Sequence, residues 1–458
     1  MIRFLLNNES IETDLPAGTT VLDFVRYRKN LKGTKIGCRE GDCGACTVIT
    51  GELVGKEVRY RTMTSCLMPL ANASGKHIVT VEGINPKGVG LTPVQSAIVE
   101  NGGTQCGFCT VGFVMSLTAF CIDGSAGTKD AAVSAIDGNI CRCTGYKSLE
   151  TAAADLCQYK SASNGDQTID AIQAGIVPEY FADVADKLKL YREAEMPGWE
   201  PSAPVVAGGT DLYVQKPDQM VIEKATHVFY SEEFRGIWES AGYIEIGASA
   251  TVTDLLESEL MSDIFPRLYD HLKLVSSTPI RNMATLGGNF VNASPIGDMT
   301  IWFLALDAEL VFNTDRSIPL KEFYLDYKKL AKEPEETITK IRFGVPDGDF
   351  HFNFEKVCKR EFLDIATVNT AISFCLKDGV LENAHVSAGG VAPVPLYLRA
   401  ASAFLNGSEI RPETIVEALE LIDDEISPIS DVRGSAEYKR LLLRQLFKAH
   451  FLELFQIA

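Results

Sequence analysis

Long hydrophobic runs are missing from this sequence of 458 residues. No stretch stays apolar over the roughly 20 residues that a helix needs to cross a bilayer, so we expect no membrane span. The first residues, MIRFLLNNES, contain neither an extended apolar region nor a cleavage site. We therefore expect no signal peptide and a cytoplasmic protein. Hydrophobic residues still make up 46% of the chain, which is enough to fill the cores of several domains.

Positive charge and histidine are also scarce. The 43 lysines and arginines face 61 aspartates and glutamates, and the net charge of −18 argues against binding to nucleic acid or to an anionic membrane. The six histidines are scattered and form no HExxH motif and no Cys–His cluster, so histidine catalysis and histidine–metal sites have little support. GxGxxG and Walker A motifs are missing too, which disfavours Rossmann and P-loop nucleotide sites.

Cysteine, in contrast, is plentiful and patterned. Eight of the twelve cysteines fall into two sets of four with iron–sulfur spacing. The first set is Cys38-x4-Cys43-x2-Cys46 with Cys66 downstream, which is the plant-type 2Fe–2S spacing. A zinc site is disfavoured for this set, because the x4 and x2 intervals within nine residues suit a tetrahedral ion poorly.

The second cysteine set is Cys106-x2-Cys109 with Cys141-x-Cys143 downstream. Taken alone, this set is compatible with either an iron–sulfur cluster or structural zinc, because paired CxxC-like motifs bind both. Disulfides are disfavoured in both sets, because nothing marks the chain as secreted. Two cluster sites would suit a protein that transfers electrons one at a time. We expect the four remaining cysteines to be small core residues, namely Cys121, Cys157, Cys358 and Cys375.

Two glycine-rich loops lie in the middle of the chain. The first, VVAGGTD, covers residues 205–211, and the second, ATLGGN, covers residues 284–289 and is followed by SPIGD at 294–298. Consecutive glycines let backbone N–H groups approach a pyrophosphate, and a nearby carboxylate can accept hydrogen bonds from ribose or ribityl hydroxyls. Either loop alone could be a structural turn. Together, beside two iron–sulfur sites, they indicate a flavin, which links hydride chemistry to one-electron transfer.

Changes in composition predict four domains and a linker. We expect the domains at residues 1–80, 81–160, 179–346 and 347–458, with a polar linker at 161–178. Strands are predicted at residues 3–6, 48–50, 205–206, 367–376 and 381–388. Helices are predicted at residues 21–25, 93–99, 109–121, 149–153 and 435–454.

The motifs resemble those of the small subunit of bacterial xanthine dehydrogenase, within the molybdenum hydroxylase family. The likeness is strongest in GCREGDCGACTV, TQCGFCTVGF, GNICRCTGY, VVAGGTDL, ATLGGNFVNASPIGD and SDVRGSAEYKRLLL. It implies a multidomain α+β fold. The implied order is a β-grasp 2Fe–2S ferredoxin domain, a helical-bundle 2Fe–2S domain, an FAD domain of the vanillyl-alcohol-oxidase type and a C-terminal α/β domain.

The resemblance also implies cofactors, partners and an activity. The chain would carry two 2Fe–2S clusters and FAD, and a large partner subunit would carry the molybdopterin and the substrate site, so we expect no catalytic residue on this chain. Electrons from hypoxanthine or xanthine would pass through the clusters to FAD and then to NAD. The implied assembly is an (αβ)2 heterotetramer that binds neither nucleic acid nor membrane.

Site residues follow from the same motifs by position. The ligands of the ferredoxin-type cluster would be Cys38, Cys43, Cys46 and Cys66, and those of the cluster nearer molybdenum Cys106, Cys109, Cys141 and Cys143. The implied FAD contacts are Val206, Ala207, Gly208, Gly209, Thr210, Asp211, Leu212, Val275, Thr285, Gly287, Gly288, Asn289, Asn292, Ser294, Pro295, Asp298, Ile338 and Lys356. Tyr327 would lie where NAD docks, and Gln105 would contact the pterin.

Some of these residues have plainer readings, and two positions depart from the family pattern. Gln105 could be an ordinary loop amide, Lys356 a solvated lysine and Tyr327 a surface or core tyrosine. Val111 replaces a frequent proline in the first turn of a helix, and we expect no loss of the cluster from this change. Val275 replaces a phenylalanine that stacks on the flavin in many relatives, and valine cannot stack.

A different molybdenum hydroxylase is the main alternative. The chain could serve an enzyme that oxidises an aldehyde, nicotinate or carbon monoxide. Relatives of those types often carry the iron–sulfur and FAD parts on separate chains, so their fusion here favours the xanthine dehydrogenase type. An assembly protein with inactive cluster motifs is a weaker alternative, and eight intact cysteine ligands argue against it.

Overall fold

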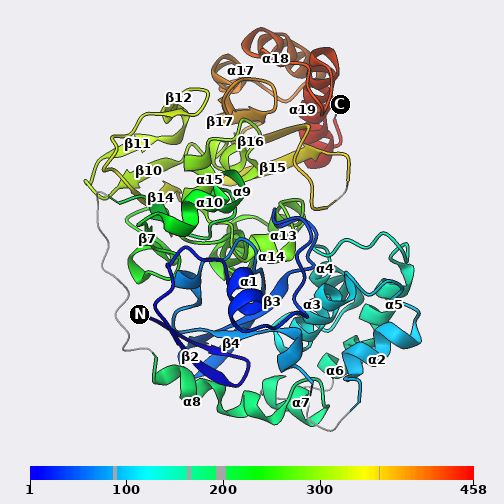
Figure 1. The fold of residues 1–458 in the computed structure, drawn as a ribbon. Coiled ribbons are helices and arrows are strands. Elements are labelled where there is room, and N and C mark those ends of the chain that lie inside the picture. The colour runs from blue at the N-terminus through cyan, green and yellow to red at the C-terminus, as the bar shows by residue number, and fades with distance from the viewer. Residues whose placement is uncertain (86–89, 162–166, 192–202, 361, 458) are drawn as a thin grey trace. The chain divides into compact units, whose positions relative to one another are not determined.

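The computed structural model describes residues 1–85, 90–161, 167–191, 203–360 and 362–457. Figure 1 shows the order of the elements along the chain. The chain divides into two compact units, and each is described here by itself. Unit 1 comprises Met1–His227 and Ser277–Ala284, and unit 2 comprises Val228–Ser276 and Thr285–Ala458. Within the described ranges, no helix has both the length and the apolar character that crossing a bilayer would require.

Unit 1 opens with a five-stranded mixed sheet in the order β2-β1-β5-β3-β4. The strands are β1 (Ile2–Leu6), β2 (Glu9–Thr13), β3 (Thr47–Val54), β4 (Glu57–Thr64) and β5 (His77–Val79). β1 runs parallel to β5 and antiparallel to β2, and β3 and β4 form a hairpin. The short helix α1 (Val21–Asp23) continues as a π-helical turn and buries Val21, Leu22, Phe24 and Val25. This is the expected β-grasp arrangement.

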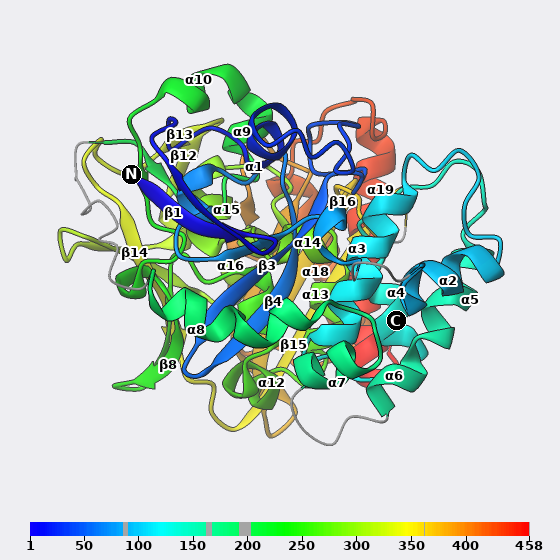
Figure 2. The same cartoon turned by 60° about the horizontal axis from the view of Figure 1, so that its bottom comes forward.

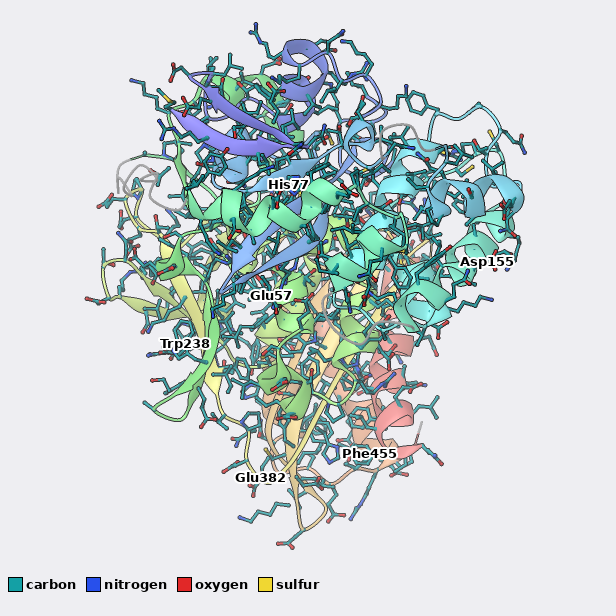
Figure 3. All side chains as sticks on the ribbon, turned by 90° about the horizontal axis from the view of Figure 1, so that it is seen from below. Glu57, His77, Asp155, Trp238, Glu382 and Phe455 are labelled. Carbon is teal, nitrogen blue, oxygen red and sulfur yellow. The ribbon has the colours of Figure 1, made fainter. Side chains whose placement is uncertain are left out.

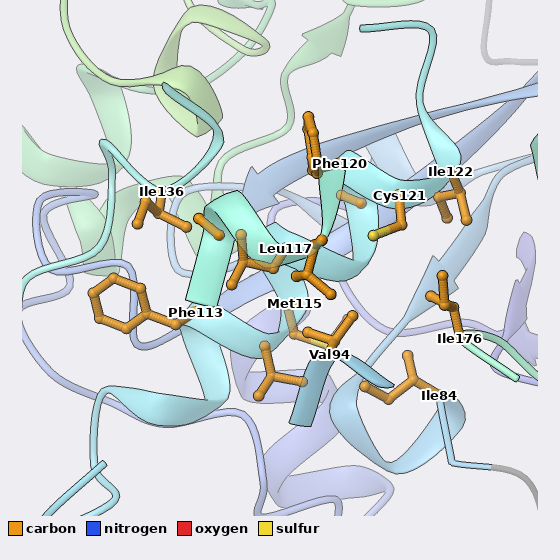
Figure 4. Close-up of a cluster of buried hydrophobic side chains, with 14 of the residues drawn as sticks. Ile84, Val94, Phe113, Met115, Leu117, Phe120, Cys121, Ile122, Ile136 and Ile176 are labelled. Carbon is orange, nitrogen blue, oxygen red and sulfur yellow. The ribbon is translucent and has the colours of Figure 1, made fainter. Parts of the chain in front are cut away.

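A helical module follows the sheet. Its helices are α2 (Pro93–Glu100), α3 (Thr110–Ile122), α4 (Lys129–Ala135), α5 (Lys147–Asp155), α6 (Cys157–Ser161) and α7 (Gln167–Gln173). A capping box between Thr92 and Gln95 fixes the start of α2. Helix α3 is the central element, since every side chain from Phe113 to Ile122 is buried. Figure 4 shows Phe113, Leu117 and Phe120 of this helix among apolar side chains from the surrounding segments.

The segment predicted as a linker differs from that prediction in its second half. Residues 162–166 lie outside the described residues, but α7 is helical and Ala171, Ile176 and Val177 are buried in the core of the helical module. The polar residues of the segment lie mainly before residue 171, and the apolar residues that follow anchor it. Residues 167–177 therefore belong to the packed module.

Helix α8 (Val184–Lys189) returns to the sheet. Val184 and Leu188 pack on Leu5, and Figure 2 shows α8 lying across β3 and β4. Just before α8, the ring of Phe181 lies 5.3 Å from the ring of His77, which Figure 3 labels. The rest of unit 1 comprises the parallel pair β6 (Val205–Val206) and β7 (Thr226–His227), and the helices α9 (Leu212–Gln215), α10 (Pro217–Ile222) and α14 (Thr278–Arg281).

Unit 2 contains two larger antiparallel sheets. The first has the order β11-β10-β14-β9-β8, formed by β8 (Ile237–Ser240), β9 (Tyr243–Gly247), β10 (Glu309–Phe312), β11 (Ser317–Pro319) and β14 (Ile338–Gly344). The second is β15 (Asp349–Val357), β16 (Val368–Lys377), β17 (Val380–Gly389) and β18 (Leu396–Tyr397). Between β11 and β14 in sequence, β12 (Tyr324–Asp326) and β13 (Lys329–Leu330) form a small hairpin.

Helices cover the sheets of unit 2. The helices that precede and follow the second glycine-rich loop in sequence are α11 (Val252–Leu256), α12 (Glu259–Ile264), α13 (Leu268–Lys273), α15 (Leu286–Asn292) and α16 (Asp298–Leu304). The C-terminal helices are α17 (Arg399–Leu405), α18 (Pro412–Glu425) and α19 (Ala436–Phe455). Helix α19 packs on β15 and β16, with Leu443, Phe447 and Phe451 in their common core. The whole chain is thus multidomain α+β, as expected.

Three of the four cysteines outside the two sets are less buried than predicted. Cys121 is buried in α3, whereas Cys157, Cys358 and Cys375 are half-buried. Side chains that are adjacent in sequence point to different faces of a helix or strand. A cysteine in an apolar stretch can therefore still face outward.

Candidate iron–sulfur and flavin sites

The first cysteine set surrounds the start of the β3–β4 hairpin. Cys38 and Cys43 lie in the loop before β3, and Cys46 immediately precedes that strand. Cys66 follows the end of β4, and the register pairs Thr47 with Thr64 across the hairpin. Because the two strand ends are neighbours, Cys46 and Cys66 are brought together. The Ser65 N–H donates to the Cys46 carbonyl oxygen at 3.3 Å.

The sulfur atoms of this set interact with backbone N–H groups and, in pairs, with one another. The N–H groups of Glu40 and Cys43 donate to Cys38 Sγ at 3.3 and 3.4 Å. The hydrogen bond with the Cys43 thiol lowers the pKa of Cys38 to about 5 and raises the pKa of Cys43. In the same way, the hydrogen bond with Cys66 lowers the pKa of Cys46 and raises that of Cys66. In each pair, one thiol, Cys38 or Cys46, is thus favoured as the thiolate, the form that binds iron.

The second set lies at the N-terminal end of α3 and in the turn before α5. Cys109 is the N-cap residue of α3, as expected, where the helix dipole favours a thiolate. Cys141 Sγ accepts hydrogen bonds from the Cys143 N–H at 3.4 Å and the Thr144 hydroxyl at 3.2 Å. Burial, together with the hydrogen bond to Cys141, raises the pKa of Cys109 to about 12. Val111 lies in the first turn of α3, and the helix begins normally without proline.

Both sets consist of two pairs of neighbouring thiols. The pairs are Cys38–Cys43 and Cys46–Cys66 in the first set, and Cys109–Cys141 and Cys106–Cys143 in the second. Among the described residues, which include all eight cysteines, no three His, Cys, Asp or Glu side chains converge as one metal ion would require. A 2Fe–2S cluster takes four thiolates, two on each iron, so paired thiols fit it. The donor sets are therefore suited to two such clusters.

The two cysteine loops touch each other inside unit 1. The N–H of Ile140, which precedes Cys141, donates to the carbonyl oxygen of Cys43 at 3.1 Å. The side-chain amide of Asn139 donates to the Gly44 carbonyl oxygen at 3.2 Å and accepts from the Ser116 hydroxyl at 2.7 Å. Ile140 and Asn139, which precede Cys141, therefore hydrogen bond to Cys43 and to the residue after it.

Glycine is required where these loops meet. A Cβ on Gly112, in the first turn of α3, would lie 2.2 Å from the Gly44 carbonyl oxygen, and Gly44 itself has a φ of +67°. We expect Gly112→Ala to destabilise the protein by about 1–3 kcal/mol, as overpacking against fixed atoms does. It should also alter the electron paramagnetic resonance (EPR) spectra of both clusters, although Gly112 is no ligand.

Denaturant unfolding and EPR of the reduced protein check this expectation. The matched control is Gly124→Ala in the same domain, where a Cβ would meet nothing within 4 Å. If both variants keep wild-type stability and spectra, the contact between the loops does not constrain the clusters.

The first glycine-rich loop packs directly against the ferredoxin domain. Asn72 donates its side-chain N–H to the Ala207 carbonyl oxygen at 2.9 Å. Gly209 has a φ of +83°, and a Cβ there would lie 2.9 Å from the carbonyl oxygen of Leu67, the residue after Cys66. A Cβ on Gly208 would lie 1.7 Å from the Met283 carbonyl oxygen. The glycines are thus needed for close packing beside Cys66, a predicted cluster ligand, whatever the loop also binds.

The rest of this loop opens α9. Asp211 is the N-cap residue of that helix, and Leu212 is its first residue. Val206, in β6, is buried. Together with Thr210, these residues complete the segment predicted to hold the FAD pyrophosphate.

The second glycine-rich loop, in unit 2, forms the start of α15. The Thr285 hydroxyl caps the helix by accepting from the Gly288 N–H at 3.3 Å. The Gly287 N–H donates to the Ala248 carbonyl oxygen at 2.8 Å, and a Cβ on Gly287 would approach that oxygen to 3.0 Å. Asn289 accepts from the N–H and hydroxyl of Thr300, which ties α15 to α16.

Asp298, the first residue of α16, is held by a buried cation. Lys356 Nζ donates to Asp298 Oδ2 at 2.7 Å, to the Leu274 carbonyl oxygen at 2.7 Å and to the Asp364 carbonyl oxygen at 2.9 Å. Its side chain is 0% exposed, so the reading of Lys356 as a solvated lysine is wrong. Asn369 Nδ2 donates to the other carboxylate oxygen of Asp298 at 2.7 Å. Because an ammonium has three donors, Lys356 is fully occupied by holding these three segments together.

We expect Lys356→Met to lower the stability of the protein by about 3–5 kcal/mol, because it leaves the Asp298 carboxylate without its cation. FAD retention should fall at the same time, since Asp298 and Val275, the residue after Leu274, are both predicted flavin contacts. Thermal unfolding and FAD content after gel filtration measure the two effects.

Lys340→Met is the control for this variant, because Lys340 forms a more exposed ion pair with Glu245. Its loss should cost about 0–1 kcal/mol and leave FAD bound. Equal behaviour of the two variants would remove Lys356 from the flavin site.

The other predicted contacts in unit 2 have clear positions. Ile338 begins β14 and is buried, as is Val275. Asn292 ends α15, and Ser294 and Pro295 follow it. The Pro295 carbonyl oxygen accepts from the Gly390 N–H at 3.0 Å.

Tyr327 occupies the turn between β12 and β13 and is 61% exposed. The next residue, Lys328, hydrogen bonds through Nζ to the backbone and side-chain oxygens of Asn292. The Tyr324 hydroxyl donates to the Phe290 carbonyl oxygen at 3.2 Å. The hairpin that carries Tyr327 is therefore attached to α15, the helix of the second glycine-rich loop.

Gln105 is exposed, and its side-chain amide donates to the Cys143 carbonyl oxygen at 3.1 Å. It is thus tied to the second cysteine set. Asn139 and Asn369 were not predicted as site residues. The signal for Asn139 was present, because it lies inside the motif GNICRC, whereas Asn369 lies in a strand with no motif.

Four family models match the chain. They are a 2Fe-2S iron-sulfur cluster binding domain at residues 4–71, a [2Fe-2S] binding domain at 80–154, an FAD binding domain in molybdopterin dehydrogenase at 179–346, and a CO dehydrogenase flavoprotein C-terminal domain at 354–454. Each cysteine set falls within one 2Fe–2S match, and the FAD-binding match includes both glycine-rich loops.

The similar proteins include both xanthine dehydrogenases and aldehyde oxidases. The chain is 28% identical to xanthine dehydrogenase of Emericella nidulans over 97% of its length, and 28% identical to aldehyde oxidase 1 of Bos taurus over 99%. It spans only 38% and 39% of those two proteins. Among solved structures, reconstituted CO dehydrogenase from Oligotropha carboxidovorans matches 54% of this chain and 88% of its own, with a TM-score of 0.51 and 26% identity.

These matches agree with the paired thiols and the glycine-rich loops, and none of them separates one substrate type from another. Together the four matches give the chain two 2Fe–2S binding domains, an FAD-binding domain and a CO dehydrogenase flavoprotein C-terminal domain, which is the domain set of an iron–sulfur and FAD subunit in the molybdenum hydroxylase family.

Proposed function

We propose that this chain is the electron-transfer subunit of a xanthine dehydrogenase. It would receive electrons from a molybdopterin centre on a large partner subunit and deliver them through two 2Fe–2S clusters to FAD and then NAD. When bound, FAD supplies the exchange between one-electron and two-electron chemistry. In this proposal the protein works in the cytoplasm as an (αβ)2 heterotetramer, and the eight cysteines and the predicted FAD contacts hold its cofactors.

The observation that carries the proposal is the order of contacts in unit 1. The Cys141 loop hydrogen bonds to Cys43, and Cys66 is followed by Leu67, which lies against Gly209 of the first glycine-rich loop. The three cofactor segments are therefore neighbours in the order that stepwise transfer requires. A protein that used its clusters only for structure would have no need for this order.

The xanthine assignment rests on similarity. Xanthine dehydrogenase of Emericella nidulans matches nearly the whole chain, and its match runs across both the iron–sulfur and the FAD segments. The same chain carries both parts here, which supports this enzyme type. Tyr327 supports NAD as acceptor, because it is exposed on a hairpin fixed to α15.

Service to an aldehyde- or carbon monoxide-oxidising enzyme is the second candidate. Aldehyde oxidase 1 of Bos taurus is as similar as the xanthine dehydrogenase, at 28% identity. The replacement of a stacking aromatic by Val275 also fits a flavin pocket that receives its acceptor differently.

Co-purification tests both candidates. The tagged chain should bring down a large molybdopterin-containing subunit, and the complex should form NADH with xanthine. Matched assays with an aldehyde and with carbon monoxide, each with NAD and with oxygen, serve as comparisons. Activity with only an aldehyde or only carbon monoxide would replace the xanthine assignment, and a chain that recruits no large subunit would contradict the subunit role.

A further inference from the structure

Charge is distributed unevenly along this acidic chain. The first 80 residues contain 11 lysines and arginines against 8 aspartates and glutamates, whereas the remaining residues contain 32 against 53. The excess of positive charge in the β-grasp domain is concentrated in one stretch. Residues 26–39, here termed the cationic segment, hold six cations and no carboxylate. They are Arg26, Arg28, Lys29, Lys32, Lys35 and Arg39.

The cationic segment leads directly into the first cysteine set. It begins in the π-helical turn after α1 and contains Cys38. The Lys35 N–H donates to the carbonyl oxygen of Ala45, the residue before Cys46, at 3.0 Å. The segment therefore lies against the loop that holds the predicted ferredoxin-type cluster.

Two of the six cations are neutralised, and four are not. Lys29 pairs with Glu9 at 2.7 Å, and Arg39 pairs with Asp23 at 2.6 Å. Arg26 and Lys32 instead donate to backbone carbonyl groups of the segment, which folds it on itself. In the part of the chain that the structure describes, Arg28 and Lys35 form no ion pair with a carboxylate.

An exposed aromatic ring accompanies these cations. Tyr27 is 61% exposed, and Lys32 Nζ lies 5.1 Å from the centre of its ring. Arg28 and Lys32 are exposed as well. The surface beside the first cluster thus combines positive charge with one large apolar side chain, a composition that suits a protein partner with an acidic docking face.

We propose that the cationic segment docks a small acidic one-electron carrier protein, which takes electrons from the ferredoxin-type cluster without passing through FAD. The proposal rests on cluster binding by Cys38 and its set. The oxidised carrier gains one electron and the cluster loses one, and no bond is formed or broken and no proton is transferred. The electron comes from the substrate oxidation that the proposed function supplies.

A carrier protein fits this surface better than other anionic partners. The cationic segment is short and offers a small contact surface. Weak redox encounters commonly bury less area than stable complexes do. Electrostatic steering raises association rates without tight binding, which a carrier that must leave again requires. A nucleic acid or an anionic membrane extends far beyond the segment and would meet the rest of the chain, where 37 lysines and arginines face 61 aspartates and glutamates.

The test measures binding of the full chain, as purified with its large subunit, to a plant-type 2Fe–2S ferredoxin as the acidic probe. Wild type should bind it with an affinity that falls as salt increases. Arg28→Glu combined with Lys35→Glu should weaken binding about tenfold or more, since like charges then face the acidic probe. Isothermal titration calorimetry at low and moderate salt gives both values.

Lys56→Glu is the matched control. Lys56 is exposed in the same domain. It lies in the turn after β3, whereas Cys46 immediately precedes the other end of that strand. This variant should bind like wild type. Cytochrome c, a basic one-electron carrier, should not bind through the segment, and its binding should not weaken in the double variant.

Each other result has a definite meaning. Unchanged ferredoxin binding in the Arg28/Lys35 double variant would overturn the proposal. Segment-dependent binding of phosphatidylserine vesicles or DNA in place of ferredoxin would assign the surface to those ligands and overturn it as well. Iron content separates this inference from the proposed function, because a chain without clusters refutes the latter whatever the calorimetry shows.

Discussion

Cys43→Ser should remove the ferredoxin-type cluster and leave the second cluster intact. Cys143→Ser should do the reverse. Each cysteine set falls within a separate 2Fe–2S binding domain that supplies all four of its thiols, so one cluster can form without the other. The backbone carbonyl group of residue 43, which accepts from the Ile140 N–H, is present in both cysteine and serine. The contact between the loops should therefore survive the substitution.

EPR of the reduced protein and iron analysis measure this effect. Wild type should show two distinct signals, and each variant should keep one signal and about half of the iron. Cys157→Ser is the control, because Cys157 is half-buried in the helical domain and belongs to neither set. If either ligand variant loses both signals while it remains folded, the assignment of the sets to separate clusters is wrong.

Tyr327→Ala should impair NAD reduction by about tenfold or more, the loss expected when a contacting aromatic ring is removed. Reduction of the clusters by substrate should remain nearly unchanged. The acceptor and the substrate react at opposite ends of the proposed relay, so a defect at one end leaves the chemistry at the other end intact. Tyr327 is 61% exposed, so the fold should survive the change.

Stopped-flow measurement of cluster bleaching and of NADH formation separates the two steps. Leu325→Ala is the matched control, since Leu325 is exposed in the adjoining strand β12. Equal slowing of both steps in Tyr327→Ala would mean that the tyrosine supports the structure of the enzyme and not the docking of NAD.

Cysteine spacing predicted the most, because the chemistry of a 2Fe–2S cluster restricts where its ligands can lie. Local patterns also placed the strands and helices well, including α3, in which every side chain from Phe113 to Ile122 is buried. Thr92 and Pro93 mark the start of α2 in the sequence as well as in the structure.

Contacts between distant residues could not be predicted in the same way. The three acceptors of Lys356 are Leu274, Asp298 and Asp364, and no local pattern joins them. The sequence alone therefore suggested a solvated lysine, although its side chain is buried. The hydrogen bond from Ile140 to Cys43 depends likewise on how two domains pack.

Polar composition misled the prediction of a linker. The polar residues lie mainly before residue 171, whereas residues 171–177 are largely apolar, and Ala171, Ile176 and Val177 all enter one core. The two glycine-rich loops also looked equivalent in the sequence. In the structure, Gly208 and Gly209 pack against Met283 and Leu67 in unit 1, whereas Gly287 packs against Ala248 in unit 2. The first loop is thereby placed beside Cys66, a predicted cluster ligand, and no motif revealed this contact.

The central claim is that this chain holds two 2Fe–2S clusters and FAD. Iron, acid-labile sulfide, zinc and flavin content of the anaerobically purified chain test it most directly. We expect about four irons and about four sulfides per chain, together with FAD in stoichiometric amount. Stoichiometric zinc without labile sulfide, or a folded chain that retains no flavin, would contradict the account.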